Sequence, residues 1–452
     1  MAEFTLTKGY DIKLDGAAPA TRFEAGVPDS VAIKPTDFPG LKPKLIAREG
    51  DAVKAGSPLF HAKGREDLLF TSPVSGTVKA IVRGARRAVL SVVVDADGKG
   101  EAEDFGAVTR DQIGGLSREE VLAKIMKAGM LGQFLQRPFD RLPDPDATPR
   151  DIFVSAVDSA PLAANTAMVV QGHEDALQAG FDIAKKLTSG AVHLGVDATD
   201  PNVPPALTQA EGVSVHRFRG PHPAGNVGVQ IHHIKPINGR NDVVWTTTVQ
   251  GLILLGRLFL TGRIDPTVTV CVAGSGAGRR GYCSTVLGAN VTAFAEATGD
   301  APRYISGDVL SGANVGADGH LGFRDTLVTI IPEVEEPEFV GWMLPGLDKE
   351  TYWGTFLSYW FGRTKKFTKN TCLNGSFRAF IVAHKYEEVM PMDLLPEALI
   401  KSCLYQDVTE MEGLGIYEVA PEDLALCEYI CPSKFEWQKQ LRTSLDYVEA
   451  EG

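Results

Sequence analysis

Cysteine is scarce in this chain of 452 residues. The six that occur are scattered: Cys271, Cys283, Cys372, Cys403, Cys427 and Cys431. So few cysteines at irregular spacing exclude a disulfide framework and indicate a reducing compartment. The first residues, Met-Ala-Glu-Phe-Thr-Leu-Thr-Lys, show no basic segment followed by an apolar one, so we expect no secretion signal.

Long apolar runs and an excess of positive charge are also lacking. The most apolar stretch, residues 251–260, is too short to span a membrane and contains Arg257, so it predicts a buried helix. The formal net charge of −12 argues against sequence-independent binding of nucleic acid, which needs a basic face. A short basic run, residues 363–369, is either a solvated face or a docking site for an acidic partner or anionic headgroups.

Signatures of catalysis, nucleotide binding and metal binding are missing. Gly274-Ser-Gly-Ala-Gly278 follows a predicted strand but departs from the dinucleotide fingerprint, so a β-turn is favoured. One close histidine cluster exists, His222, His232 and His233, without metal-ligand spacing. In a strand, His232 and His233 would point to opposite faces. We therefore expect no catalytic residue and no metal site.

The length predicts roughly two to four domains, and the first of them is rich in short strands and turns. Glu49-Gly-Asp-Ala-Val53 and Ser72-Pro-Val-Ser-Gly-Thr-Val78 resemble the entry and exit of a lipoyl-type β hammerhead. Lys63 stands where carrier domains of that type hold a modified lysine, but its neighbours Ala62 and Gly64 are not those of a carrier. A structural hammerhead is favoured over an acyl carrier.

Alternating strands and helices follow, which favours a mostly parallel sheet. A capping-box pattern at Ser117 predicts the start of a helix, and another helix is expected over 176–187. Strands are predicted at 151–156, 191–196, 212–218 and 267–273. Short strands continue to about 334, and beyond 338 the chain is expected to be mostly helical, with a short β segment over 376–385.

Two segments are candidates for ligand binding. The first contains Phe134, Arg137, Pro138 and Phe139, where prolines fix the chain beside an aromatic–arginine pair. The favoured alternative is a packed Phe139 and a surface Arg137. The second is a dense turn after a predicted strand, a position where α/β sheets bind ligands. Its candidate residues are Gly220, Pro221, His222, Pro223 and Gly225.

The carboxyl-terminal part contains half of an iron–sulfur motif. In C-x2-C-x2-C-x3-C-P runs, thiolates hold the cluster. Here Cys427-Glu-Tyr-Ile-Cys431-Pro432 keeps the last two ligands, whereas Pro421 and Leu424 occupy the other two positions. Two thiols cannot close a four-ligand cluster, so Cys427 and Cys431 are interpreted as vestigial.

From end to end the chain resembles the A subunit of Na+-translocating NADH:quinone oxidoreductases. The resemblance includes Gly129-x4-Phe134-x2-Arg-Pro-Phe139, the 220–225 turn, Gly256-Arg-Leu-Phe-Leu-Thr-Gly262, Ile305-Ser-Gly-Asp-Val-Leu-Ser-Gly312, Val389-Met-Pro-Met-Asp-Leu-Leu-Pro396 and Asp423-Leu-Ala-Leu-Cys-Glu-Tyr-Ile-Cys-Pro432. A more distant resemblance links it to the C subunit of the Rnf complex and the flavin subunit of respiratory complex I, which carry flavin, iron–sulfur clusters or both.

The resemblance implies an α/β multidomain fold in four parts. They are a lipoyl-like β hammerhead (1–110), a Rossmann-like α/β domain (111–262), a β-grasp module (263–335) and a mostly helical domain with the degenerate ferredoxin-like motif (336–452). It also implies a peripheral subunit on the cytoplasmic side of the bacterial inner membrane, in a six-subunit pump that includes membrane subunits B and C. That complex uses NADH, FAD, FMN, riboflavin, iron–sulfur centres and quinone.

We expect this subunit itself to bind no cofactor and to support electron transfer coupled to Na+ export. Two alternatives stay open. One is an Rnf-type electron carrier with its own flavin or iron–sulfur cluster. The other is a quinone-binding module at the two candidate segments.

Overall fold

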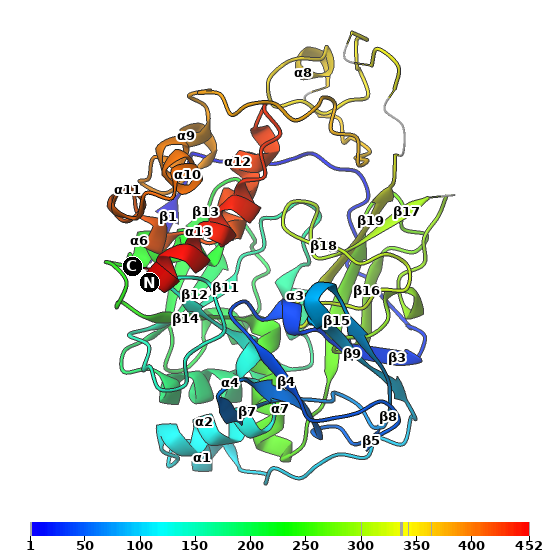
Figure 1. Ribbon diagram of the computed structural model, residues 1–452, viewed down its shortest axis with the longest axis vertical. Helices are drawn as coiled ribbons and strands as arrows, with labels where there is room; N and C mark the ends of the chain where they lie inside the picture. Colours follow the sequence, from blue (N-terminus) through cyan, green and yellow to red (C-terminus); the bar gives the residue numbers. More distant parts are fainter. Residues whose placement is uncertain (1, 300, 335–337, 342, 363, 452) are drawn as a thin grey trace.

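The computed structural model describes residues 2–299, 301–334, 338–341, 343–362 and 364–451. The predicted boundary between residues 335 and 336 and Arg363 of the basic run lie outside these residues. The described chain is a mixed α/β protein with four sheets, which confirms the predicted α/β class (Figure 1). No helix within the described ranges is both long and apolar enough to cross a bilayer.

The central sheet has six strands in the order β1-β13-β12-β11-β14-β10. These are β1 (Ala2–Thr5), β13 (Ser214–Arg219), β12 (Val192–Asp197), β11 (Ile152–Ala156), β14 (Val244–Thr248) and β10 (Phe134–Arg137). All neighbours pair in parallel except β10, which is antiparallel to β14. The strands predicted at 151–156, 191–196 and 212–218 are therefore confirmed. The apolar runs of β11 and β12 fit central strands that are covered on both faces, whereas β13 is more polar and more exposed.

Helices and the carboxyl-terminal region cover the two faces of this sheet. On one face, α4 (Glu174–Leu187) packs along α7 (Val249–Thr261), with α2 (Arg118–Lys127) beside α4. Ser117 caps α2 by accepting a hydrogen bond from the Glu120 amide, as the capping-box pattern predicts. On the other face, α6 (Val227–Ile234) packs against β11.

A second six-stranded sheet lies beside the first, in the order β18-β17-β19-β15-β16-β2. Its strands are β18 (Ala313–Asn314), β17 (Pro302–Ser306), β19 (Leu327–Pro332), β15 (Thr267–Ala273), β16 (Gly281–Val286) and β2 (Arg22–Phe23). Residues 274–278 form the turn between β15 and β16, and no helix follows them. The β-turn interpretation of this glycine cluster is confirmed.

The remaining two sheets are built from residues 30–96. One has the order β3-β9-β8-β5 and the other β4-β6-β7. Their strands are β3 (Ser30–Ile33), β9 (Val89–Ala96), β8 (Gly76–Arg83), β5 (Ala52–Val53), β4 (Pro43–Leu45), β6 (Pro58–Ala62) and β7 (Arg65–Thr71). Lys63 stands exposed between β6 and β7, beside Gly64 at a φ of 87°.

The first residues of the chain do not stay with these two small sheets. Strand β1 pairs with β13 at the edge of the central sheet, and β2 pairs with β16 at the edge of the second sheet. The amino-terminal segment therefore connects three sheets.

Most helices of the carboxyl-terminal region lie from residue 386 onward. These helices are α9 (Tyr386–Val389), α10 (Pro396–Tyr405), α11 (Val408–Gly413), α12 (Ala425–Ile430) and α13 (Trp437–Glu451). A core containing Trp437 and Leu441 joins them to Phe153 and Phe218 of the central sheet. Residues 338–385 contain one described helix, α8 (Ser358–Phe361), and the β segment expected over 376–385 is not formed. The prediction of a mostly helical segment is wrong for residues 338–385, because the described residues outside α8 form mainly turns and irregular chain.

Close contact between α4 and α7 depends on two glycines. A Cβ atom on Gly256 would overlap the carbonyl oxygen of Ala176, and one on Gly180 would overlap that of Leu252. Replacing either glycine would force apart two helices that together cover one face of the central sheet.

We expect Gly256→Ala to destabilise the protein by about 1–3 kcal/mol, the usual cost of overpacking a core. Gly413→Ala is the matched control, because no atom lies within 4 Å of the added Cβ and alanine favours a helix. The midpoint of urea unfolding should fall for Gly256→Ala only. Equal midpoints for the two variants would contradict the packing described.

Candidate functional site

Two segments predicted as candidates meet at one cavity. Arg137, His222 and Gly225 line a cavity of about 500 Å³, called here the switch-point cavity. Its wall also includes Asp158, directly after β11, and Thr248, where β14 passes into α7. The other predicted residues lie outside the lining: Phe134, Pro138, Phe139, Gly220, Pro221 and Pro223.

The position of this cavity follows from the order of the strands. After β11 the chain continues to β12 and β13 on one side, and then returns to β14 on the other side of β11. In open α/β sheets, ligands bind at the carboxyl ends of the strands where the order reverses. The switch-point cavity lies at that place, between β11 and β14.

Arg137 is held in a buried cluster of charges. Its side chain is 1% exposed, and its Nη1 lies 2.9 Å from Oδ2 of Asp423, which is fully buried. Its Nη2 lies 3.0 Å from Oε1 of Glu422, and its Nε lies 3.6 Å from Oδ1 of Asp140. Burial alone lowers the pKa of Arg137, but the three carboxylates outweigh it and raise that pKa. The interpretation of a surface Arg137 is therefore wrong, because carboxylates from its own turn and from one distant segment pair with it inside the protein.

Phe139, in contrast, is packed, as the favoured interpretation predicts. It is 4% exposed, and its ring meets Tyr417 edge-on at 5.7 Å between centroids. Phe134 is fully buried and packs against Trp245 at 5.7 Å. Both rings stabilise the core instead of forming a wall of the cavity.

The 220–225 turn is fixed by hydrogen bonds on both sides. The His222 amide donates to Oδ1 of Asp11 at 2.9 Å, and His222 Nδ1 lies 3.1 Å from Oγ of Ser159. The same Ser159 hydroxyl accepts from the Gly225 amide at 2.8 Å. A Cβ on Gly225 would overlap the carbonyl oxygen of Val157, so only glycine permits this approach to the strand end. Burial lowers the pKa of His222 and favours a neutral imidazole.

Acidic side chains on the cavity wall were missed by sequence reasoning. Desolvation raises the pKa of Asp158 to about 7, and the nearby Asp308 contributes to the increase. Asn226 donates from Nδ2 to the carbonyl oxygen of Glu422 at 3.1 Å and so joins the turn to the carboxyl-terminal region. Asp158 could have been found, because it directly follows a predicted strand. Asp308 and Glu422 come from other parts of the chain and carry no local signal.

His232 and His233 belong to helix α6 instead of a strand. His232 Nδ1 lies 2.8 Å from Oε2 of Glu418, and its Nε2 accepts from the Asp393 amide at 3.0 Å. His233 Nε2 lies 2.8 Å from the carbonyl oxygen of Pro391. These contacts attach α6 to the carboxyl-terminal region. Among the residues that the structure describes, no group of three His, Cys, Asp or Glu side chains is placed to hold a metal ion.

The half motif does not fit an iron–sulfur cluster. Cys427 on α12 and Cys431 at its end are 1% and 0% exposed. Tyr386 donates from its hydroxyl to Sγ of Cys431 at 3.4 Å, and burial raises the pKa of Cys427. A cluster of this type needs four protein ligands, and this run supplies two thiols. Pro421 and Leu424, at the positions of the other ligands, belong to a short 3-10 helix.

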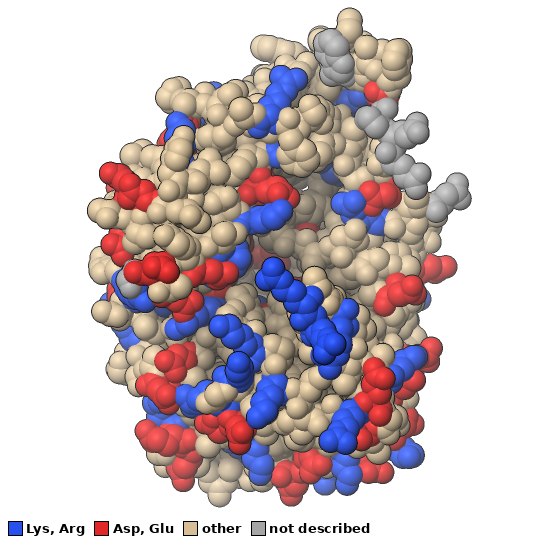
Figure 2. All heavy atoms as spheres, in the orientation of Figure 1, with Lys and Arg blue, Asp and Glu red and all other residues tan. Residues whose placement is uncertain are grey.

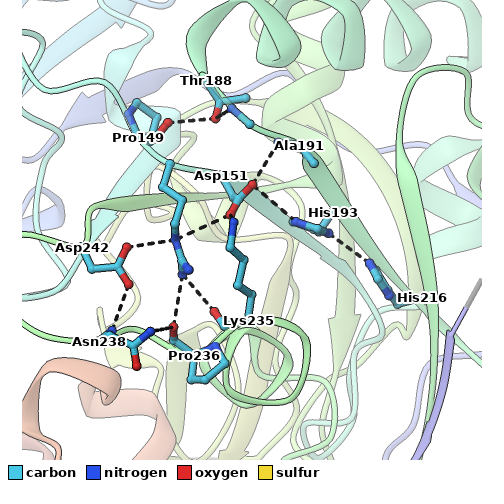
Figure 3. Close-up of polar contacts among 12 residues, drawn as sticks. Pro149, Asp151, Thr188, Ala191, His193, His216, Lys235, Pro236, Asn238 and Asp242 are labelled. Carbon is cyan, nitrogen blue, oxygen red and sulfur yellow. Dashed lines mark hydrogen bonds and ion pairs between the residues drawn. The ribbon is translucent and has the colours of Figure 1, made fainter.

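A separate polar cluster surrounds Asp151 at the amino end of β11 (Figure 3). Lys235 Nζ lies 2.6 Å from Oδ2 of Asp151, and His193 Nε2 lies 3.6 Å from Oδ1. His193 Nδ1 and His216 Nε2 are 3.0 Å apart, on the neighbouring strands β12 and β13. This cluster stands at the end of the sheet opposite to the switch-point cavity, and its contacts join neighbouring strands and the chain after α6.

Comparison with known proteins places these features in one family. Family models match residues 4–97 (NqrA N-terminal barrel-sandwich hybrid domain), 116–264 (NqrA second alpha/beta domain) and 269–317 (NQRA C-terminal domain). The A subunit of the Na(+)-translocating NADH-quinone reductase of Neisseria meningitidis serogroup A is 36% identical over 450 residues, 99% of each chain. Its counterpart from Pasteurella multocida is 36% identical over 452 residues, 99% of this chain and 100% of its own.

Solved structures give a weaker likeness. An NAD+-reducing nickel–iron hydrogenase in the air-oxidised state shares 12% identity with this chain at a TM-score of 0.41. The match covers 76% of this chain and 68% of that one.

We expect Arg137→Met to destabilise the protein by about 3–5 kcal/mol, because it leaves the buried charge of Asp423 unpaired. Combining it with Asp423→Asn should restore much of the loss, since the uncompensated charge is then removed. Arg65→Met is the matched control, whose partners Asp67 and Asp146 are exposed, and should cost less than about 1 kcal/mol. Urea unfolding checks all three. If Arg137→Met loses no more stability than Arg65→Met, the buried charge cluster is contradicted.

We expect the stability of the protein to fall as the pH drops from about 6.5 toward about 4, in part through His216. Burial, and then His193, lowers the pKa of His216 to about 4 in the folded state. An unfolded histidine titrates near about 6.5, so between these values the unfolded chain binds more protons. His216→Gln should reduce the difference between unfolding midpoints at neutral and acid pH, whereas the exposed His384→Gln should not. If His216→Gln, like His384→Gln, leaves the difference between the neutral and acid unfolding midpoints unchanged, then His216 is not responsible for the pH dependence.

Proposed function

The chain belongs to the family formed by the A subunits of Na(+)-translocating NADH-quinone reductases, and we propose that it occupies that position on the cytoplasmic side of a bacterial inner membrane. It is part of an oxidoreductase complex that transfers electrons from NADH to quinone and transports Na+. The observation that carries this conclusion is identity of 36% along essentially the whole of both chains.

In this proposal the subunit supports electron transfer in the complex and binds no cofactor itself. Buried cysteines with proline and leucine at the other ligand positions favour this over an Rnf-type carrier. NADH, FAD, FMN, riboflavin and the iron–sulfur centres are then bound by the other subunits. Membrane subunits B and C are the proposed partners, and the chain contacts them as a peripheral subunit.

We also propose the division into parts 1–110, 111–262, 263–335 and 336–452. The sheets of residues 30–96 support a lipoyl-like hammerhead, and the strand order around β11 supports a Rossmann-like second part. The sheet containing β15 to β19 supports a β-grasp module. The pairing of β1 with β13 and of β2 with β16 attaches the start of the first part to the second and third parts.

Quinone binding is the second candidate function. Its support is the convergence of Arg137, His222 and Gly225 at one cavity large enough for a small ligand. Arg137 Nη1 and Nη2 each donate one hydrogen bond to Asp423 and Glu422, whereas its Nε, 3.6 Å from Asp140, is buried without a hydrogen-bond partner. The guanidinium therefore keeps donors that a ligand in the cavity could use. An acyl-carrier role for Lys63 is a third candidate, which a covalent mass increment on the intact protein would reveal.

Co-expression with the other five subunits tests the main proposal. A tag on this chain should co-purify the complex together with NADH-dependent quinone reductase activity. The isolated chain should contain iron, acid-labile sulfide and flavin far below one equivalent, because its two remaining thiols cannot complete a cluster. Stoichiometric iron and sulfide, or bound flavin, would favour the Rnf-type carrier instead.

The quinone-binding candidate is tested by filling the cavity. Leu135→Trp places a large side chain on the wall of the switch-point cavity and should weaken the binding of a quinone analogue at least tenfold. Leu90→Trp, on the remote strand β9, is the matched control. Unchanged analogue binding by Leu135→Trp would eliminate this site.

A further inference from the structure

A second cavity lies next to the first and has different walls. It encloses about 490 Å³ between the β17–β19 strands, residues 350–377 and the turn that follows α12. We call it the aromatic cavity, because Tyr352, Trp353, Phe377 and Tyr429 line it. Figure 2 shows that this face of the molecule is hollowed between the α12–α13 side and the β17–β19 side, with both basic and acidic side chains around the hollow.

Two lysines on the cavity wall, Lys369 and Lys434, form no ion pair with any residue that the structure describes. Lys369 Nζ lies 3.4 Å from the hydroxyl of Tyr429 and 4.8 Å from the centre of its ring. Desolvation lowers the pKa of both amines, although the more distant charge of Glu350 partly opposes this at Lys369. Burial disfavours the charged form of a lysine, and its pKa falls when neighbouring charges do not fully balance it.

The acidic side chains of the same wall are already occupied. Glu350 accepts hydrogen bonds from the hydroxyls of Tyr10 and Tyr429. Glu428 accepts from the Gln438 amide at 2.9 Å, and Glu436 pairs with Lys439 at 3.0 Å. These contacts hold the carboxylates in place but, for Glu350 and Glu428, do not cancel their charge, because the donors are neutral. Lys369 and Lys434 form no described ion pair, so an anion placed between them would offset the cost of their burial.

The rim of the cavity exposes apolar side chains to water. Trp353 is 42% exposed, Leu373 50% and Phe377 67%, and all three line the cavity. Nearby in sequence, Trp360 and Phe361 of α8 are 62% and 79% exposed. Exposed apolar patches of this kind mark surfaces that contact a partner or a membrane. Aromatic residues mixed with lysines are typical of the membrane interface.

We propose that the aromatic cavity is a binding site for an anionic phospholipid, with the headgroup phosphate between Lys369 and Lys434 and the acyl chains against the exposed aromatic rim. The lysines recognise the phosphate, and the rim selects a phosphate that carries an apolar body. The exposed Lys365 and Lys366 add long-range attraction to an anionic surface. The proposal rests on the proposed location of this chain at a membrane.

Vesicle flotation of the purified full chain tests this proposal. The protein should float with vesicles of phosphatidylcholine mixed with phosphatidylglycerol, and much less with phosphatidylcholine alone. Salt should reduce the binding, because part of the attraction is between charges. Each lysine near an anionic membrane contributes about 1 kcal/mol, so Lys369→Gln/Lys434→Gln should weaken binding by roughly thirtyfold.

The matched control removes two positive charges elsewhere. Lys44→Gln/Lys99→Gln changes two lysines with side chains 62% and 67% exposed on the amino-terminal sheets and their loops, and should change binding less than about threefold, given the screening of exposed charges. Equal losses for the two double variants would mean that net charge alone is sensed, and would overturn the site. An unchanged far-ultraviolet circular dichroism spectrum excludes misfolding.

Two further measurements distinguish a lipid from a soluble phosphate compound, and a lipid from a protein partner. Glycerol 3-phosphate, which lacks acyl chains, should compete weakly, and equal competition would assign the site to a soluble phosphate compound. No flotation with either vesicle, together with intact co-purification of the complex, would overturn lipid binding and assign the rim to a protein partner. Loss of co-purification with the wild-type chain would instead contradict the proposed membership of the complex, so the two failures are distinguishable.

Discussion

The ion cluster around Arg137 connects the α/β part of this protein to its carboxyl-terminal region. A guanidinium group at the end of an edge strand is buried, and its charge is balanced by Asp140 from the same turn and by Glu422 and Asp423 from a segment almost three hundred residues later. Buried charges tolerate little displacement, because each partner that moves away leaves another unpaired. The cluster therefore determines how the carboxyl-terminal segment lies over the central sheet, and it forms one wall of the switch-point cavity.

The same segment explains what has become of the half iron–sulfur motif. The two ligand positions that lack cysteine, Pro421 and Leu424, enclose Glu422 and Asp423. The short 3-10 helix over these residues now presents two carboxylates to Arg137. Cys427 and Cys431 remain as small apolar side chains in the core around Trp437. A stretch that resembles a metal-binding run thus contributes packing and charge pairing in this chain.

The regular parts of the fold could be predicted from local patterns. Continuous apolar runs indicated β11, β12 and β15, helical spacing indicated α4, and Ser117 with Glu120 marked the start of α2. The burial of Arg137, the helix at Val227–Ile234 and the irregular course of residues 338–385 could not be predicted, since each depends on contacts with distant segments. For the candidate site, the two segments were found, but their meeting at one cavity depends on the strand order, which no local pattern encodes. Its acidic wall combines residues that are far apart in the sequence, from Asp140 to Glu422, for the same reason.

The pairing of β1 with β13 has a consequence for how the chain reaches this structure during synthesis. Residues 2–5 leave the ribosome well before their partners at 216–219, which follow more than two hundred residues later. Contacts this distant in sequence form late, because the entropy of closing a long loop opposes them. The amino-terminal strand must therefore stay unpaired while the small sheets fold, and its edge of backbone donors and acceptors is open to other chains during that time. Strand β1 can therefore join the central sheet only after β13 has been synthesised.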